Sequence, residues 1–285
     1  MEKIRIYATT ANLGSGFDVL GMALDLYNEY GFEIADEYRL ENFDNRYNNE
    51  DNLIIKSYKK ACAYLNKKAM PLHLVELTKN IPSSRGLGSS ASCIICGIKI
   101  ANYLNNNILS EEEMLNLATK IEGHPDNVCP AIYGGLQASI ISDNEIKNIK
   151  LDIHKDFIFT LCIPNFELET EMARNVLPKE IKLGDATYNL SRIVSLIKGF
   201  EKGDLDLIKE GIKDRFHVNY RLNLIPQSQK LIEHFPDIAI TISGAGPTLL
   251  AISKENVSKS IGAFLGPDWS ILEVKPQDKG VTIYA

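Results

Sequence analysis

The sequence predicts an α+β fold built in two parts. Strand-like and helix-like segments follow one another along the 285 residues in a mixed order, rather than as strict strand–helix–strand repeats. A Gly/Ser-rich loop runs directly into an apolar helical stretch in the first half. A polar stretch, 142–155, separates two groups of elements and predicts a first domain, 1–154, and a second, 155–285.

The first part combines strands with amphipathic helices. Its Asn-rich stretch 42–52 predicts a mobile surface loop. Ser110 and Glu113 form a capping box that starts a helix expected to end near Gly123. Strands are expected near 3–9, 30–41, 72–78 and 134–141, and helices at 51–65, 89–104 and 110–122.

The second part opens with an apolar strand at 157–164. Helices are expected near 188–202, 204–217 and 226–235, and strands near 238–242, 247–252, 270–274 and 280–284.

Composition excludes several classes of protein. The net charge of −6 argues against a nucleic-acid surface, which needs a basic stripe. No apolar run is long enough for a membrane span and no signal region precedes the first strand, so we expect a cytoplasmic protein. Five cysteines lie mostly in apolar runs and predict reduced, buried thiols, including the Cys93/Cys96 pair.

The loop Ile81–Ser92 carries the strongest functional signal. Gly86 and Gly88 let the backbone approach a ligand closely, and the following helix directs its unsatisfied N–H groups and positive dipole end at the loop. A di- or triphosphate fits such a cradle. The loop matches neither the Walker pattern nor the dinucleotide fingerprint, and on pattern alone it could also be a connector that begins a core helix.

Two further glycine-rich segments, Ala8–Gly21 and Thr241–Ala251, accompany this loop. Together the three segments, in this order, resemble the three motifs of the GHMP small-molecule kinases. The amino-acid sequences of the first motif and of Glu122–Val128 resemble those of the homoserine kinase branch of that family. The resemblance runs from about Ile4 to the C-terminal strand.

The resemblance implies a two-domain architecture, an N-terminal α/β domain with the phosphate loop and a C-terminal ferredoxin-like α+β domain. It implies ATP-dependent phosphorylation of the side-chain hydroxyl of L-homoserine, with Mg²⁺ as cofactor, as part of threonine biosynthesis. A homodimer is common in the family, and the sequence leaves the oligomeric state open. A kinase for another alcohol, such as mevalonate or shikimate, and a non-catalytic nucleotide sensor are the alternatives.

For ATP and Mg²⁺ the resemblance implies a serine and a glutamate as metal ligands, here Ser90 and Glu122. Some relatives carry the acid farther upstream, where this chain has Asn116, so Glu122 depends on a shortened connection. Asn52 is expected near adenine, and the third motif is expected to fold against the phosphate loop. The predicted nucleotide-binding residues are Asn52, Pro82, Ser83, Ser84, Arg85, Gly86, Leu87, Gly88, Ser89, Ser90, Ala91, Ser92, Gly244 and Gly246.

For the substrate the resemblance points to Asn12, Asp18, His124, Arg174 and Arg221. Homoserine is a zwitterion at pH 7, so Asp18 can accept from its ammonium, and the two arginines can grip its carboxylate through charge-assisted bonds.

Asp126 is the candidate for the general base, although an aspartate in a Pro-Asp-Asn turn can equally cap its own backbone. We favour the structural role. Transfer through a loose transition state needs positioning and charge neutralisation more than a strong base. The hypothesis is therefore in-line transfer with the proton passing to the γ-phosphate.

The chain differs from the usual motif sequences of the family at two loops. Two prolines are missing from the first motif, where the chain has Tyr7–Thr10 and Gly14–Phe17. The phosphate loop carries Arg85 where small residues are common, and this arginine could contact a phosphate or point to solvent.

Overall fold

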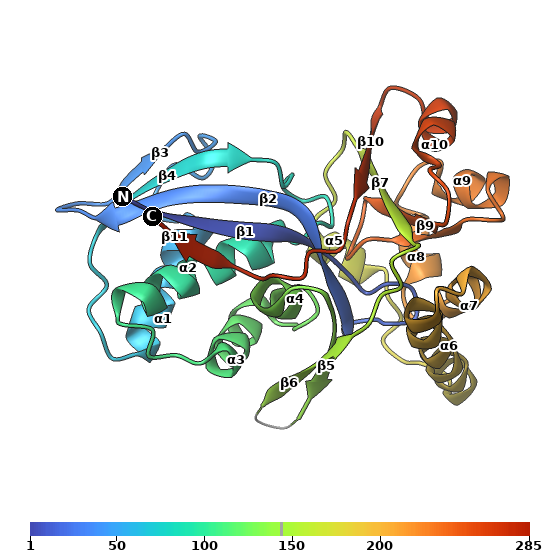
Figure 1. Ribbon diagram of the computed structural model, residues 1–285, viewed down its shortest axis with the longest axis horizontal. Coiled ribbons are helices and arrows are strands. Elements are labelled where there is room, and N and C mark those ends of the chain that lie inside the picture. Colours follow the sequence, from blue (N-terminus) through green and yellow to red (C-terminus); the bar gives the residue numbers. More distant parts are fainter. Residues whose placement is uncertain (143–144) are drawn as a thin grey trace.

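The computed structural model describes residues 1–142 and 145–285 and contains two sheets (Figure 1). The larger sheet follows the order β11-β1-β2-β4-β3, with β5 paired to β2 and β6 paired to β5. Its strands within the described residues are β1 (Glu2–Ala11), β2 (Leu20–Ile34), β3 (Arg39–Glu41), β4 (Leu72–Lys79), β5 (Leu136–Ile141), β6 (Ile146–Leu151) and β11 (Thr282–Tyr284).

Helices lie along one face of this sheet (Figure 1). Apolar side chains of β1, β2 and β4, among them Ile4, Phe32 and Leu74, form one buried cluster with residues of these helices, including Ile95. Burial of this apolar surface is the main favourable contribution to folding. The helices are α1 (Leu53–Tyr64), α2 (Ser89–Leu104), α3 (Glu111–Glu122) and α4 (Val128–Tyr133).

The second sheet has the order β10-β7-β9-β8 and is antiparallel throughout. Along the chain, its elements follow the order β-α-β-β-α-β, with one or more helices between the strands of each half. This order is that of a ferredoxin-like domain, so the ferredoxin-like expectation and the α+β class are confirmed. Its strands are β7 (Ile158–Pro164), β8 (Ala239–Ile242), β9 (Leu249–Ser253) and β10 (Trp269–Val274). Its helices are α5 (Thr170–Asn175), α6 (Leu183–Lys202), α7 (Leu205–Gly211), α8 (Val218–Leu222), α9 (Ser228–His234) and α10 (Ser258–Leu265).

Several predicted boundaries were wrong. β2 begins at Leu20 rather than near residue 30, because its first residues are buried and pair with β1 on one side and β5 on the other. The predicted helix 204–217 ends at Gly211, and a separate helix, α8, follows. The break comes from Asp214, whose carboxylate accepts the backbone N–H groups of Phe216, His217 and Val218 at 2.6–3.0 Å.

The polar stretch 142–155 contains strand β6 and is more than a connector. It is polar because β6 is an edge strand with half of its residues exposed. Residues 143 and 144 of this stretch lie outside the described residues. The last strand, β11, pairs with β1, so the end of the chain returns to the first sheet, and the division at 154/155 stays a prediction.

Two expectations from composition can be compared with the structure. All five cysteines carry free thiols, four of them buried, and Cys93 is partly buried. Among the described residues, no helix combines the length and the apolar content that a bilayer crossing requires.

The contact of α1 with α2 depends on Gly97. A Cβ atom at this position would lie 2.3 Å from the backbone oxygen of Ile54. We therefore expect Gly97→Ala to lower the free energy of unfolding by about 1–3 kcal/mol, measured by urea denaturation. Gly184→Ala, in the first turn of α6, is the matched control, because no atom lies within 4 Å of its added Cβ. This control should raise stability by about 0.4–1 kcal/mol, and equal effects of both variants would contradict the packing argument.

Candidate active site

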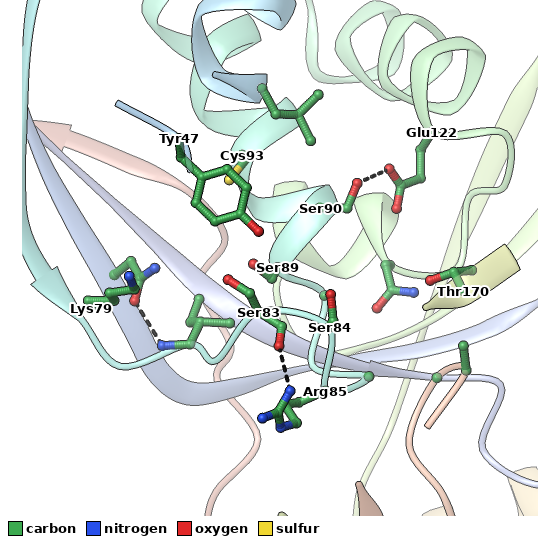
Figure 2. Close-up of a pocket in the computed structure, with 18 of the residues that line it drawn as sticks. Tyr47, Lys79, Ser83, Ser84, Arg85, Ser89, Ser90, Cys93, Glu122 and Thr170 are labelled. Carbon is green, nitrogen blue, oxygen red and sulfur yellow. Dashed lines mark hydrogen bonds between the residues drawn. The ribbon is translucent and has the colours of Figure 1, made fainter. Parts of the chain in front are cut away.

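One cavity of about 260 Å³ collects side chains from both parts of the chain. It is lined by the phosphate loop, the start of α2, the end of α3, and residues of α5 and α8. Figure 2 shows Tyr47, Cys93 and Lys79 on one side of the loop serines, and Glu122 and Thr170 on the other. The cavity therefore has two ends, with the phosphate loop between them.

The phosphate loop has the backbone that its sequence predicts. Gly86 and Gly88 have φ of 73° and 69°, values that glycine adopts without strain. Gly88 precedes α2, and no acidic residue occupies the first turn of that helix. The N–H groups at the start of α2 thus offer an anion site, and no acid in the first turn of the helix itself opposes its positive dipole end.

The third motif packs against this loop, as the sequence predicted. The hydroxyl of Ser243 donates to the backbone oxygen of Gly86 at 2.7 Å, and a Cβ on Gly86 would lie 2.3 Å from the oxygen of Ser243. A Cβ on Gly88 would lie 2.0 Å from Oγ1 of Thr9 in the first motif. The glycines are thus required for close approach of three chain segments.

The loop residues divide into two groups. Leu87, Ala91 and Ser92 are buried away from the cavity, and Pro82 and Gly246 do not line it either. The predicted loop residues that line the cavity are Ser83, Ser84, Arg85, Gly86, Gly88, Ser89, Ser90 and Gly244.

Arg85 does something that the sequence did not indicate. Its guanidinium donates to the backbone oxygens of Pro164, Ser83 and Asn165 at 3.0–3.2 Å. Only 14% of the side chain is exposed, and Glu167 lies 3.6 Å away. The arginine therefore fastens the phosphate loop to the end of β7, which belongs to the second sheet.

Ser90 and Glu122 lie together on the same side of the loop as Thr170 (Figure 2). The hydroxyl of Ser90 donates to Oε2 of Glu122 at 2.7 Å. Burial is the main cause that raises the pKa of Glu122. Asn116, the upstream alternative, instead bonds the backbone of Glu112 and Ile146. A hydroxyl and a carboxylate at this distance are the hard oxygen donors that Mg²⁺ prefers.

Asn12 and Asp18 are held by the first glycine-rich loop. The Asn12 side chain donates to the backbone oxygen of Gly244 at 2.7 Å and accepts from the backbone N–H of Asp18 at 2.9 Å. Arg174 of α5 donates to both carboxylate oxygens of Asp18, at 2.8 and 3.2 Å. One carboxylate and one guanidinium thus meet in a bidentate pair.

His124 and Asp126 form a second pair beside them. Nδ1 of His124 lies 2.6 Å from Oδ1 of Asp126, which also accepts from the backbone N–H of Asn127. Burial opposes a charge on His124, but the hydrogen bond and the charge of Asp126 outweigh it and raise the pKa of His124. The ligand atoms of Asp18, His124 and Asp126 lie within 4.8 Å of one another.

Arg221 is 1% exposed and is fixed on every side. Its guanidinium donates to the oxygens of Ala173 and Gly244 and to Nδ1 of His217, at 3.1–3.3 Å. Burial and the nearby charge of Arg174 lower the pKa of Arg221 to about 10, so it stays charged at neutral pH. The structure therefore brings both predicted arginines to one end of the cavity.

Asp214 and His217 support Arg221, and sequence reasoning missed both. Nε2 of His217 donates to the oxygen of Gly14 at 2.8 Å, which leaves Nδ1 as the acceptor for Arg221. Burial lowers the pKa of His217, in keeping with this neutral form. The available signal was an aspartate shortly before a helix, a common capping pattern, but the predicted helix 204–217 covered it.

Asn52 lines the other end of the cavity. Its Oδ1 accepts from the backbone N–H of Ile54, and its Nδ2 donates to the oxygen of Tyr47 at 2.9 Å. The residue thus caps α1 and holds the loop 42–52 in place. The aromatic residues around it, Tyr30, Phe43 and Tyr47, line the cavity and were not predicted as site residues.

Comparisons with known proteins agree with this geometry. Residues 52–135 match the family model of the GHMP kinases N-terminal domain. A homoserine kinase from Clostridium beijerinckii is 42% identical over 293 residues, covering 99% of this chain and 98% of that protein. One from Clostridium botulinum is 39% identical over 300 residues, with the same coverage.

Solved structures give the same result. The crystal structure of homoserine kinase from Cytophaga hutchinsonii superposes with a TM-score of 0.87 at 26% identity, covering 99% of this chain and 97% of that one. A mevalonate kinase with a TM-score of 0.71 and 19% identity, covering 97% and 99%, shares the fold. With a glycine-rich phosphate loop and full-length relatives near 40% identity, this chain belongs to the homoserine kinase family of the GHMP kinases.

Proposed function

We propose that the protein transfers the γ-phosphoryl group of ATP to the side-chain hydroxyl of L-homoserine, with Mg²⁺ as cofactor. One observation carries this proposal. The phosphate loop, Arg174 and Arg221 line one continuous cavity, and Asp18 forms a bidentate pair with Arg174. A cytoplasmic location and a homodimer stay predictions from the sequence.

The charged group fits the substrate chemically. The carboxylate of Asp18 is complementary to an ammonium, and the two guanidinium groups are complementary to a carboxylate. Because Arg221 is buried and held by three acceptors, little side-chain entropy remains to be lost when it binds an anion. Such positioning converts a reaction between two molecules into one within a single complex.

Ser90 and Glu122 are the residues that would hold Mg²⁺, since their oxygens already lie 2.7 Å apart beside the phosphate loop. Bound Mg²⁺ neutralises charge on the phosphates. The start of α2 would add backbone N–H donors to the same oxygens.

Asp126 is better suited to orientation than to proton removal. Only 1% of the residue is exposed, and Oδ1 already accepts from His124 and from the backbone N–H of Asn127. In our proposal Asp126 orients His124, His124 contacts the substrate hydroxyl, and the hydroxyl proton passes to a γ-phosphate oxygen.

The proposed reaction is tested by ATP consumption with purified protein and Mg²⁺. We expect turnover with L-homoserine, and kcat/KM values at least tenfold lower for L-serine, L-threonine, mevalonate, galactose and shikimate. Turnover that is faster with mevalonate or shikimate would replace the substrate, and nucleotide binding without any turnover would favour the sensor alternative.

The charged group has its own variant within this test. Arg174→Lys should raise KM for homoserine about ten- to hundredfold with KM for ATP nearly unchanged, because lysine lacks the bidentate fork that Arg174 uses. Arg215→Lys is the control, since Arg215 lies on the surface over Tyr188. A parallel rise of both KM values would contradict the assignment.

Replacement of Asp126 tests the proton route. If Asp126 only orients His124, Asp126→Asn should lower kcat by about tenfold or less, because the carboxamide oxygen can still accept from Nδ1. A general base contributes about 10²–10⁴-fold. Loss of kcat in that range, with an unchanged thermal unfolding midpoint, would establish Asp126 as the base.

Replacement of Glu122 tests the metal site. Glu122→Gln should raise the Mg²⁺ concentration for half-maximal rate by more than tenfold, since a carboxamide is a weaker ligand for a hard cation. Glu112→Gln, at an exposed position of the same helix, is the control. An unchanged Mg²⁺ requirement would contradict the assignment of Glu122 as a metal ligand and would favour other carboxylates, such as those of Asp18 and Asp126.

A further inference from the structure

Glu76 is a buried acid at the end of the cavity away from Ser90 and Glu122. It lies on β4 directly opposite Tyr30 of β2, and both residues line the cavity together with Lys79 and Cys93. Only 8% of the Glu76 side chain is exposed. In the part of the chain that the structure describes, its Oε2 has no hydrogen-bond partner.

A buried carboxyl oxygen without a donor is costly. Such a group loses the hydrogen bonds of water and gains none in return, which costs roughly 1–3 kcal/mol or more when it is charged. The nearest cationic group, Nζ of Lys79, lies 4.0 Å from Oε2, beyond hydrogen-bond length. Burial is the main cause that raises the pKa of Glu76, and the charge of Asp44 adds to it. Within the described residues Oε2 thus has no donor, and Glu76 is one of the residues that line the cavity.

The walls around Glu76 suit a flat aromatic group. The rings of Tyr30 and Phe43 are nearly parallel, with centroids 5.9 Å apart and an interplanar angle of 5°. Tyr47, Leu53 and Cys93 extend the same end of the cavity, and Figure 2 shows Tyr47 and Cys93 on the same side of the loop serines. Apolar and aromatic walls with few polar groups are typical of small-molecule sites, in which the polar groups fix orientation.

Asn52 does not meet the same need. Its carbonyl oxygen caps α1, and its amide donates to the oxygen of Tyr47. Glu76, unlike Asn52, therefore has a carboxyl oxygen without a partner among the described residues.

We propose that the carboxyl group of Glu76 accepts a hydrogen bond from the exocyclic 6-amino group of adenine and selects adenine over 6-oxopurines. The inference rests on the proposed function only in that the cavity takes ATP. The 6-amino group is a donor, whereas hypoxanthine and guanine carry an acceptor oxygen at the same position. That oxygen would face the carboxyl oxygen, so two acceptors would meet in a desolvated place.

The test measures nucleotide binding by calorimetry, without homoserine, for ADP, IDP, GDP and purine riboside 5′-diphosphate, which lacks the 6-amino group. The unaltered protein should bind ADP at least tenfold more tightly than each of the other three. Equal affinity for ADP and the purine riboside diphosphate, or tighter binding of GDP or IDP, would overturn the proposal.

Glu76→Gln then tests the residue itself. Its carboxamide can accept from a 6-amino group or donate to a 6-oxo group, so the ratio of IDP to ADP dissociation constants should fall about tenfold or more. Glu41→Gln, on the adjacent strand β3 and outside the cavity lining, should leave the ratio unchanged. The proposal fails if Glu76→Gln leaves the ratio unaltered, or if both variants shift it equally.

These measurements are independent of phosphoryl transfer. A protein that binds ADP with a Glu76-dependent preference, yet does not phosphorylate homoserine, would refute the proposed substrate and retain the base selection. A protein that phosphorylates homoserine but uses ITP as well as ATP would support the proposed substrate and refute the base selection by Glu76.

Discussion

The close approach of three backbone segments is the constraint on which the site depends. Gly86 meets the carbonyl of Ser243, and Gly88 meets Thr9, at distances that leave no room for a Cβ atom. These contacts bring the end of β1, the start of α2 and the turn after β8 to one point, although they come from distant parts of the sequence. The phosphate loop, the predicted substrate residues and the second sheet are therefore positioned by one packing arrangement. A side chain at either glycine would separate them together rather than singly.

A second layer of polar contacts turns this packing into a charge pattern. The side chain of Asn12 links the first motif to the third through its bond to Gly244. The same side chain accepts the backbone N–H of Asp18 and so holds that residue in place. Asp214 accepts the first N–H groups around α8 and thereby holds the short helix that carries Arg221. A five-residue helix has little intrinsic stability, so a buried carboxylate cap has a large share in fixing this arginine. Residues outside the proposed substrate contacts thus determine where Asp18 and Arg221 lie.

The sequence predicted the parts of this protein whose cause is local. The glycines of the phosphate loop, the capping box at Ser110 and the apolar strand predicted at 157–164 each depend on neighbouring residues. The structure has all three, with the strand at Ile158–Pro164. Longer-range effects were missed. The start of β2 depends on pairing with β5, the break before α8 depends on Asp214, and the hold of Arg85 on β7 depends on a contact between the two sheets. The resemblance to the family motifs predicted that Arg174 and Arg221 belong to one site. Composition and periodicity alone did not predict that these two arginines would lie close together.

The electrostatics of the cavity explain why a polyanion would lie where the phosphate loop is. Carboxyl groups stand at the two ends, Glu76 on β4 and Glu122 at the close of α3, and burial raises the pKa of both. Between them the start of α2 presents unpaired N–H groups and a positive dipole end with no acid of its own. A triphosphate bound there avoids both carboxylates unless a cation bridges it to one of them. Because Ser90 adds a second oxygen only at Glu122, the proposed bridge would form at that end, beside the charged residues that would hold the alcohol. The same asymmetry leaves Glu76 to a neutral donor, which is what the amino group of a purine offers.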